Sequence, residues 1–243
     1  MMDCFEKNKG NISKRMEAGL NLLREHYEVR EVPVADYFGE LNIQGNVYHV
    51  THYEVVGVGN LLVMVEPDGA QLQMDSFVLM PYYKNLPLFT TDYMYMGERR
   101  GFLNEIYDLV DPERKTELYQ SFIAKFAANK EKYSYLPDMP LKACWYDAIR
   151  PVCTAKAPTS EHDEEIITLF LENLRTFIEM EQAMPLITDE EEYQAKWRQN
   201  KAYSDGLVDN GGVSTDVFKA TLGADKTKEF FDEVFFAPAR FRK

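Results

Sequence analysis

The chain has 243 residues, which is enough for one large domain or two small ones. Its formal net charge of -13 at pH 7 argues against nucleic acids and anionic membrane surfaces as partners. Apolar residues make up 45% of the chain, yet no apolar run approaches the roughly 20 residues that a membrane-spanning helix needs.

The first predicted element is an amphipathic helix over residues 11–26. Met16, Leu20 and Leu23 fall on one face of this helix, as a core-facing stripe requires. The preceding residues 1–7 lack the basic and apolar regions of a signal peptide, so we expect a cytoplasmic protein.

From about residue 32 to residue 96 the pattern is that of β-strands. The run 47–56 is rich in β-branched and aromatic residues, which favour strands. Turn signals at 45–46, 57–60 and 67–69 separate such runs. These intervals are short, so they favour antiparallel hairpins over βαβ crossovers.

Helical patterns then return. Asp111 and Pro112 form an N-cap and first-turn pair for a helix that is predicted to run to about Lys132. The following segment, 139–158, is bounded by prolines, and we expect a strand within it near 148–154.

The last third of the chain is predicted to contain four helices and one loop. Residues 160–163 match a capping box ahead of a helix with apolar residues at helical spacing, namely Ile167, Phe170, Leu171, Leu174, Phe177 and Ile178. Thr188 caps a further helix that ends near Tyr203, and the Gly/Asp/Asn-rich segment 204–212 is predicted to be a loop. Two terminal helices follow, with a break near Gly223.

One strand-rich block therefore lies between helical blocks, without internal repeats or a Ser/Pro-rich linker. The simplest architecture is a single domain over 1–243 of the α+β class. We expect an α/β/α sandwich, in which a central antiparallel sheet has helices on both faces.

Several common sites are excluded by the same sequence. Cys4, Cys144 and Cys153 form no Cys-x-x-Cys pair, and none has a His at metal-ligand spacing, so we expect reduced thiols and no metal site. Neither GxGxxG nor GxxxxGK[ST] occurs, which argues against a Rossmann dehydrogenase and against a kinase.

The most informative stretch is 77–95, where two apolar, strand-like runs flank a polar bridge and Asp92 lies among aromatic and aliphatic neighbours. A carboxyl in such surroundings loses hydration, which raises its pKa and keeps a proton available near neutral pH. The alternative is that Asp92 points outward from an edge strand.

His52 and Glu54 form a second candidate group. Residues alternate between the two faces of a strand, so these two side chains share one face while Tyr53 takes the other. A carboxylate and an imidazole on one face can share and relay protons. The alternative is a cross-strand hydrogen bond on a solvated face.

The stretch from Pro81 to Asp92 resembles the ferredoxin-dependent bilin reductases and, with them, the red chlorophyll catabolite reductases. In that family a strand ending in Pro leads through a short bridge to Asp-Leu-Pro-aliphatic-Phe-Gly-x-Asp, whose last Asp is the proton donor and falls on Asp92. Asn85 stands here for the first Asp and Thr90 for the Gly. The resemblance implies the sandwich fold already expected from the element pattern.

The resemblance implies roles for three further residues. Glu54 matches a Glu that faces the bilin, with His52 beside it. Ser76 occupies a position where the family has His or Asn, and a hydroxyl can donate a hydrogen bond but cannot act as an acid near neutral pH. Arg150, at the end of a Trp-containing segment, is suited to binding a propionate carboxylate, although an ordinary ion pair is the alternative.

The family also has an Asp or Asn in a C-terminal loop. Here the 204–212 segment offers Asp205, Asp209 and Asn210, of which we favour Asp209, with Asn210 as a contact to the substrate. Such composition is also typical of an ordinary turn.

Together the resemblance implies a reductase of an open-chain tetrapyrrole that holds no cofactor and receives single electrons from ferredoxin or flavodoxin. Arg240, Arg242 and Lys243, or Arg99 and Arg100, are candidate basic patches for such an acidic donor, and an ordinary solvated surface is the alternative for both. The alternatives are a non-catalytic tetrapyrrole carrier of the same fold and an unrelated α+β protein.

Overall fold

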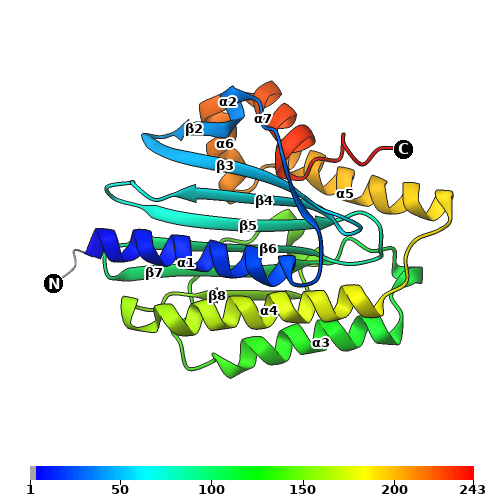
Figure 1. Cartoon of the computed structure of the whole chain (residues 1–243), viewed down its shortest axis with the longest axis horizontal. Helices are drawn as coiled ribbons and strands as arrows, with labels where there is room; N and C mark the ends of the chain where they lie inside the picture. The colour runs from blue at the N-terminus through cyan, green and yellow to red at the C-terminus, as the bar shows by residue number, and fades with distance from the viewer. Residues whose placement is uncertain (1–3) are drawn as a thin grey trace.

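The computed structural model of the protein describes residues 4–243 (Figure 1). Its centre is an antiparallel sheet of eight strands in the order β1-β3-β4-β5-β6-β7-β8, with β2 paired to the same edge of β3 as β1. The strands are β1 Val29–Val32, β2 Glu40–Ile43, β3 Asn46–Val55, β4 Gly59–Glu66, β5 Gln73–Pro81, β6 Leu88–Met96, β7 Arg99–Tyr107 and β8 Val152–Lys156.

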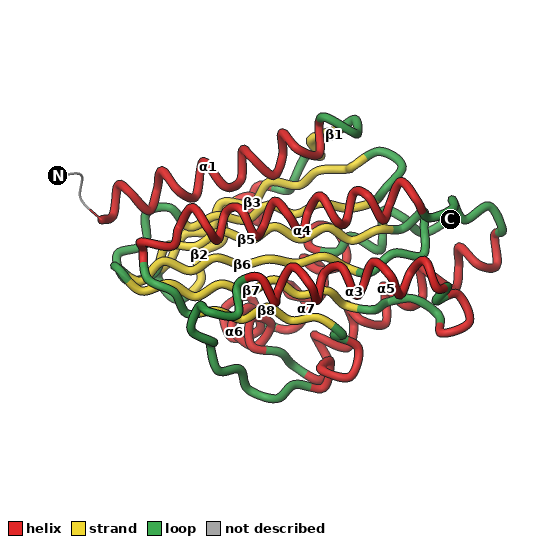
Figure 2. Tube along the Cα trace, turned by 90° about the horizontal axis from the view of Figure 1, so that it is seen from below, coloured by secondary structure: helices red, strands yellow, loops and turns green. Residues whose placement is uncertain are grey.

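Helices cover both faces of this sheet, which confirms the predicted sandwich. Figure 2 shows α1, α4 and α3 in front of the strands, and α5, α6 and α7 lie on the other side. The helices are α1 Cys4–Arg24, α2 Asp36–Gly39, α3 Glu117–Lys132, α4 Asp163–Ala183, α5 Glu190–Asn210, α6 Val213–Leu222 and α7 Ala224–Phe230, followed by a π-helical turn, Phe231–Phe235. Within residues 4–243, no helix is both long and apolar enough to cross a membrane.

The face under α1, α3 and α4 contains a buried ion pair. Arg15 of α1 and Asp75 of β5 are in contact, and both side chains are fully buried. Arg15 also donates to Thr91 Oγ1 at 2.5 Å, and the Tyr95 hydroxyl donates to Asp75 at 3.2 Å. The guanidinium lies 4.4 Å from the centre of the Phe170 ring. Asp75 therefore points away from the face that carries Ser76, as strand alternation requires.

A second buried polar cluster joins the turn between β6 and β7 to the start of α4. Asp163 accepts two hydrogen bonds from Arg100, at 2.7 and 3.0 Å, and one from Tyr93 at 2.7 Å. Arg100 is only 2% exposed, so the predicted basic patch at Arg99 and Arg100 is wrong for Arg100. The expected capping box is also absent from this helix start, because the Asp163 carboxylate is engaged by Arg100 instead of the backbone.

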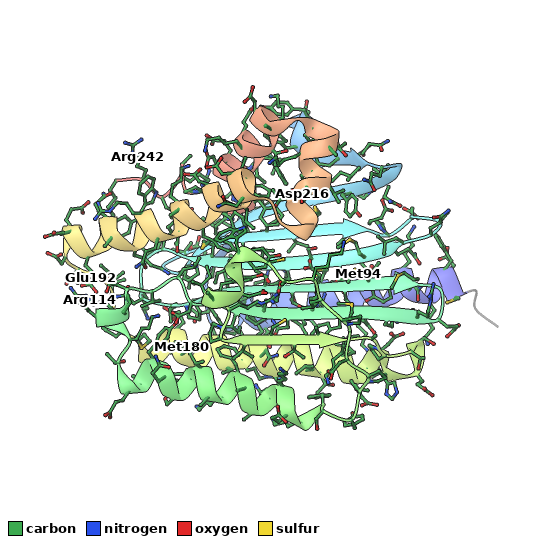
Figure 3. All side chains as sticks on the ribbon, turned by 180° about the vertical axis from the view of Figure 1, so that it is seen from behind. Met94, Arg114, Met180, Glu192, Asp216 and Arg242 are labelled. Carbon is green, nitrogen blue, oxygen red and sulfur yellow. The ribbon has the colours of Figure 1, made fainter. Side chains whose placement is uncertain are left out.

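Polar side chains of α5 fasten this helix to the end of the sheet. The buried Lys196 donates to the carbonyl oxygens of Leu86 and Leu109 at 2.7 and 2.8 Å, and burial lowers the pKa of its ammonium to about 7. Asn200 donates to the carbonyl of Pro81 at 2.8 Å. Seen from behind, the N-terminal part of α5 lies beyond the end of the sheet, where Glu192 approaches Arg114 to 3.5 Å (Figure 3).

The largest difference from the sequence prediction is at 204–212. This segment continues α5 to Asn210 instead of forming a loop, because Tyr203, Leu207 and Val208 pack into the core beside α6 and the π-helical turn. Buried apolar contacts outweigh the turn preference of Asp, Asn and Gly. The chain turns only at Gly211, whose φ of 78° suits glycine.

Other boundaries shift by smaller amounts. The first helix begins seven residues before Asn11, at Cys4. Asp111 caps a short 3-10 turn, Pro112–Arg114, while Thr116 caps α3 itself. The strand expected near 148–154 is β8, preceded by a 3-10 turn at Trp145–Ile149. The sequence prediction missed β7 altogether, whereas the break at Gly223 is confirmed.

We predict that Arg15→Met lowers the free energy of unfolding by about 3 kcal/mol, because it leaves Asp75 charged and unpaired in the core. Urea denaturation at pH 7 measures this change. Lys14→Met is the matched control, since Lys14 pairs with Glu164 in the exposed surface and should contribute less than about 1 kcal/mol. Equal stability of the two variants would contradict a stabilising role for the buried pair.

Candidate active site

A cavity lies between the sheet and the C-terminal helices. Its volume is about 380 Å³, within the range of small-molecule sites of about 300–1,000 Å³. Most of its wall is apolar and aromatic. The aromatic lining residues are Tyr48, Tyr107, Tyr146, Tyr203, Phe218, Phe231, Phe235 and Phe236.

Met64, Ser76 and Asp92 line the floor of the cavity from three neighbouring strands, and Leu103 continues their row across the sheet without lining the cavity. Met64, Ser76, Asp92 and Leu103 are direct partners in the registers of β4, β5, β6 and β7. Their side chains therefore point to the same face. Because β6 lies between β5 and β7, the alternative of an outward-pointing Asp92 on an edge strand is wrong.

Asp92 is held by one hydrogen bond, and among the described residues no Lys, Arg or His lines the cavity on its face of the sheet. Ser76 Oγ donates to Asp92 Oδ1 at 2.5 Å. Burial raises the pKa of the Asp92 carboxyl from 3.8 to about 6, against the lowering effect of the Ser76 bond. The Glu105 charge adds to the rise, and Arg15, on the opposite face of the sheet, opposes it. Asp92 thus retains a proton in a substantial fraction of molecules near pH 6.

Glu105 is a second carboxylate in the cavity wall, and the sequence analysis missed it together with its strand, β7. It is 9% exposed and forms an ion pair with Arg150. Arg150 binds Asp147 with its other nitrogen at 2.5 Å. Arg150 was predicted to bind a propionate carboxylate of the substrate, but in the structure it forms ordinary ion pairs with two side chains of the protein. Its side chain lines a different hollow, of about 550 Å³, together with Lys130 and Lys156.

Four tyrosines bring hydroxyl groups to the cavity. Burial raises the pKa of Tyr48 to about 12 and that of Tyr107, Tyr146 and Tyr203 still further, so all four are neutral hydrogen-bonding groups at physiological pH. The ring centres of Tyr107 and Tyr203 lie 5.1 Å apart. The abundance of aromatic residues in the sequence is only weak evidence for an aromatic cavity wall, because well-packed sheets without a cavity have a similar composition.

His52 and Glu54 share a face as predicted, but neither lines the cavity. The His52 ring contacts Asn60 Oδ1, and Asn60 in turn donates to the carbonyls of Val234 and Phe235 in the π-helical turn. Burial lowers the pKa of His52 to about 4, so the ring is neutral at pH 7 and does not relay protons as a cation. Glu54 lies 3.8 Å from Arg240.

Glu54 lies outside the cavity because it belongs to β3, which is not a direct neighbour of β5. The strand beside β5 is β4, and the residue opposite Ser76 is Met64, whereas Glu54 lies one strand further away on β3. The match of Glu54 to a bilin-facing carboxylate is therefore wrong for this cavity.

The C-terminal candidates also lie outside the cavity. Asp209 and Asn210 are exposed at the end of α5. Asp205 is bound by Lys201 and by Lys228, and these lysines hold the pKa of its carboxyl below the usual value despite partial burial. The continuation of α5 through this segment turns all three away from Asp92.

The charge of the cavity wall is unusual for a site that would hold an anion. Asp92 and Glu105 are its charged side chains, and among the described residues no Lys, Arg or His lines it. Over the same residues, no group of three or more His, Cys, Asp or Glu side chains is arranged to bind a metal ion.

Helix α6 forms part of the cover through Thr215, Val217 and Phe218. It runs between Gly211 and Gly223, which both have positive φ angles, of 78° and 79°. Trp145 Nε1 donates to the Gly211 carbonyl at 2.8 Å, which joins this end of the cover to the turn that carries Tyr146.

Neither the protein-family models nor the curated proteins contain a match to this chain. Among solved structures, the fold is similar to that of phytochromobilin synthase from tomato in complex with biliverdin. The two structures superpose with a TM-score of 0.76 over 95% of this chain and 85% of the tomato protein, at 14% sequence identity. At this identity the likeness establishes a shared fold.

We predict that Asp92→Asn stabilises the protein at alkaline pH and has little effect at pH 4. The native Asp92 pKa of about 6 exceeds the ordinary 3.8, so the parent binds an extra proton when folded and loses that stabilisation as the pH rises through 6. The amide removes the cost of a buried charge, which is at most about 3 kcal/mol at pH 8. Chemical denaturation at pH 4, 6 and 8 tests this; a constant difference between the two proteins would refute it.

We predict the opposite pH dependence for His52→Gln. The native pKa of His52 is depressed from 6.5 to about 4, so the parent loses stability as the pH falls from about 6.5 to about 4. The variant should lack this loss and should be relatively more stable at pH 4 than at pH 8. An unchanged difference between parent and variant across this window, in the same denaturation series, would contradict the depressed pKa.

Proposed function

We propose that the cavity binds an open-chain tetrapyrrole and that Asp92 protonates this ligand during its reduction. The observation that carries the proposal is a carboxyl with a pKa near 6 on the floor of an aromatic cavity. A carboxyl of this kind is suited to general acid catalysis near neutral pH. The shared fold with a biliverdin-bound synthase supports the choice of ligand class.

The aromatic wall suits a flat conjugated ligand. Rings of Tyr48, Tyr107 and Phe235 offer stacking surfaces for such a ligand. Because no cation lines the cavity among the described residues, we propose that the ligand's carboxylates remain at its mouth. Arg150 would contact a propionate only from behind Glu105, in the neighbouring hollow.

Reduction of one double bond requires two electrons and two protons. We propose that the electrons arrive singly from ferredoxin or flavodoxin, with no nicotinamide or flavin held by the chain. Asp92 gives its proton to the ligand, which makes the ligand easier to reduce. The resulting carboxylate is stabilised by the Ser76 hydroxyl but disfavoured by burial, so Asp92 takes up a second proton from solvent water and passes it to the ligand.

The C-terminal residues Arg240, Arg242 and Lys243 are exposed and form the candidate docking patch for an acidic electron donor. Arg242, labelled in Figure 3, lies 5.7 Å from the Trp197 ring, and Lys243 lies 3.8 Å from the Tyr193 ring. Both basic groups are thus placed along the outer side of α5.

A tetrapyrrole carrier that lacks the chemistry is the second candidate function. Ser76 cannot act as an acid, and Asp209 is exposed outside the cavity, so neither of these predicted site residues can supply a proton to the ligand. Both observations favour a carrier. A carrier binds the ligand stoichiometrically and leaves it unchanged when a reductant is supplied.

An anaerobic absorption titration distinguishes these functions. Biliverdin is added to the purified protein, and reduced ferredoxin is then added to the complex. A shifted biliverdin band that changes again on reduction supports the reductase, whereas a shifted but stable band supports the carrier. If the band does not shift, neither function holds.

We predict that Asp92→Asn binds biliverdin with unchanged affinity and slows its reduction at least about 100-fold, because the amide cannot donate a proton. Asp209→Asn, an exposed Asp-to-Asn change outside the cavity, is the matched control and should reduce biliverdin at the parental rate. Reduction by Asp92→Asn at the parental rate would exclude Asp92 as the proton donor.

A further inference from the structure

The proposed reaction leaves the second carboxylate of the cavity without a role. Glu105 of β7 pairs in register with Thr90 of β6, one step along the same face from Asp92 and Leu103. The two carboxylates are therefore diagonal neighbours on adjacent strands, and both line the cavity. Their surroundings differ, because Glu105 is ion-paired with Arg150 and Asp92 receives a bond from a neutral hydroxyl.

We propose that Glu105 is the second functional carboxylate of this cavity, where it accepts a ring N–H from the bound ligand and, as an anion, keeps the proton on Asp92. The ligand contact rests on the proposed function, whereas the effect on Asp92 is a property of the ligand-free protein. The ligand class that fits both carboxylates is a planar heterocycle that has N–H donors and no carboxylate on its buried part.

The contacts of Glu105 leave one oxygen for a ligand. Arg150 and, at 4.0 Å, the Cys153 thiol both approach Oε1. Among the side chains that the structure describes, no hydrogen-bond donor reaches Oε2 of this cavity-lining residue. Arg150 is fixed in turn by Asp147, whose Oδ2 accepts from the Cys144 amide at 3.0 Å. Glu105 is thus held in place before a ligand arrives.

Glu105 lies on the same face of the sheet as Asp92, and its negative charge favours the protonated form of the Asp92 carboxyl. Ser76 from β5 and, from α1 across the sheet, Arg15 both favour the carboxylate form. Arg15 is itself paired with Asp75. The tyrosines that face the cavity are neutral, and Glu66 of β4 accepts a bond from the Asp68 amide at 2.9 Å further along the strand. Removal of the Glu105 charge should therefore lower the pKa of Asp92.

The test is an NMR titration of Asp92 in the ligand-free protein, with the carboxyl carbons of Asp labelled and the Asp92 signal assigned by its loss in Asp92→Asn. Glu105→Gln keeps the shape and removes the charge, and we expect the Asp92 midpoint to fall by about one unit. Glu105→Asp keeps the charge and should retain most of the raised midpoint. Asp147→Asn, which removes the other Arg150 partner outside the cavity, should leave the midpoint unchanged.

Biliverdin binding tests the ligand contact separately. We expect Glu105→Gln to weaken binding about tenfold, the usual consequence of losing a hydrogen bond to a charged group. An unchanged Asp92 midpoint in Glu105→Gln would overturn the electrostatic role, and unchanged affinity would overturn the contact. If the parent does not bind biliverdin, the proposed function and the ligand contact both fail, while the midpoint still decides the effect on Asp92.

Discussion

Removal of the Asp92 carboxyl from water is the constraint on which the rest of the site depends. A carboxyl that is to stay protonated near neutral pH must have little solvent around it and no cation within easy reach. The aromatic cover from α5, α6 and the π-helical turn provides the first condition. The second is met because none of the described residues that line the cavity is a Lys, Arg or His. The polar contacts of Lys196 and Asn200 matter for the chemistry because they hold that cover against the sheet.

Side chains along β5 and β6 point alternately to the two faces of the sheet. The same two strands therefore line a charged core on one face and the cavity on the other. Asp75 and Thr91 face the helices α1 and α4, where a buried guanidinium binds both. Their neighbours Ser76 and Asp92 face the cavity, on the opposite side of the sheet from that cation. The positive charge is therefore close enough to moderate the Asp92 pKa and is kept from contact with it by the backbone of the sheet. A cation on the cavity side would form an ion pair and remove the acid.

The sequence predicted the parts of the site that local pattern determines. The sandwich follows from the order of strand and helix patterns along the chain, and the apolar setting of Asp92 follows from its sequence neighbours, whereas Ser76 was identified through the family resemblance. Glu105 was missed because β7 begins with Arg99-Arg100-Gly101, which is not typical of a buried strand. The position of Glu54 was predicted wrongly because the sequence of a single strand does not show which strands lie beside it in the sheet. The position of Asp209 was predicted wrongly because tertiary contacts extend α5 over a segment rich in turn-forming residues.

The Arg15–Asp75 pair also has a consequence for how the sheet assembles. If β5 slipped by one residue against its neighbours, every side chain on it would exchange faces. Asp75 would then enter the cavity beside Asp92, and Arg15 would face the Ser76 hydroxyl in place of a carboxylate. Both changes leave buried charges without partners. The free-energy cost of a register slip is therefore larger than the cost of misplacing apolar residues alone. An ion pair on the far side of the sheet thereby helps to ensure that the chain folds with its acid on the correct face.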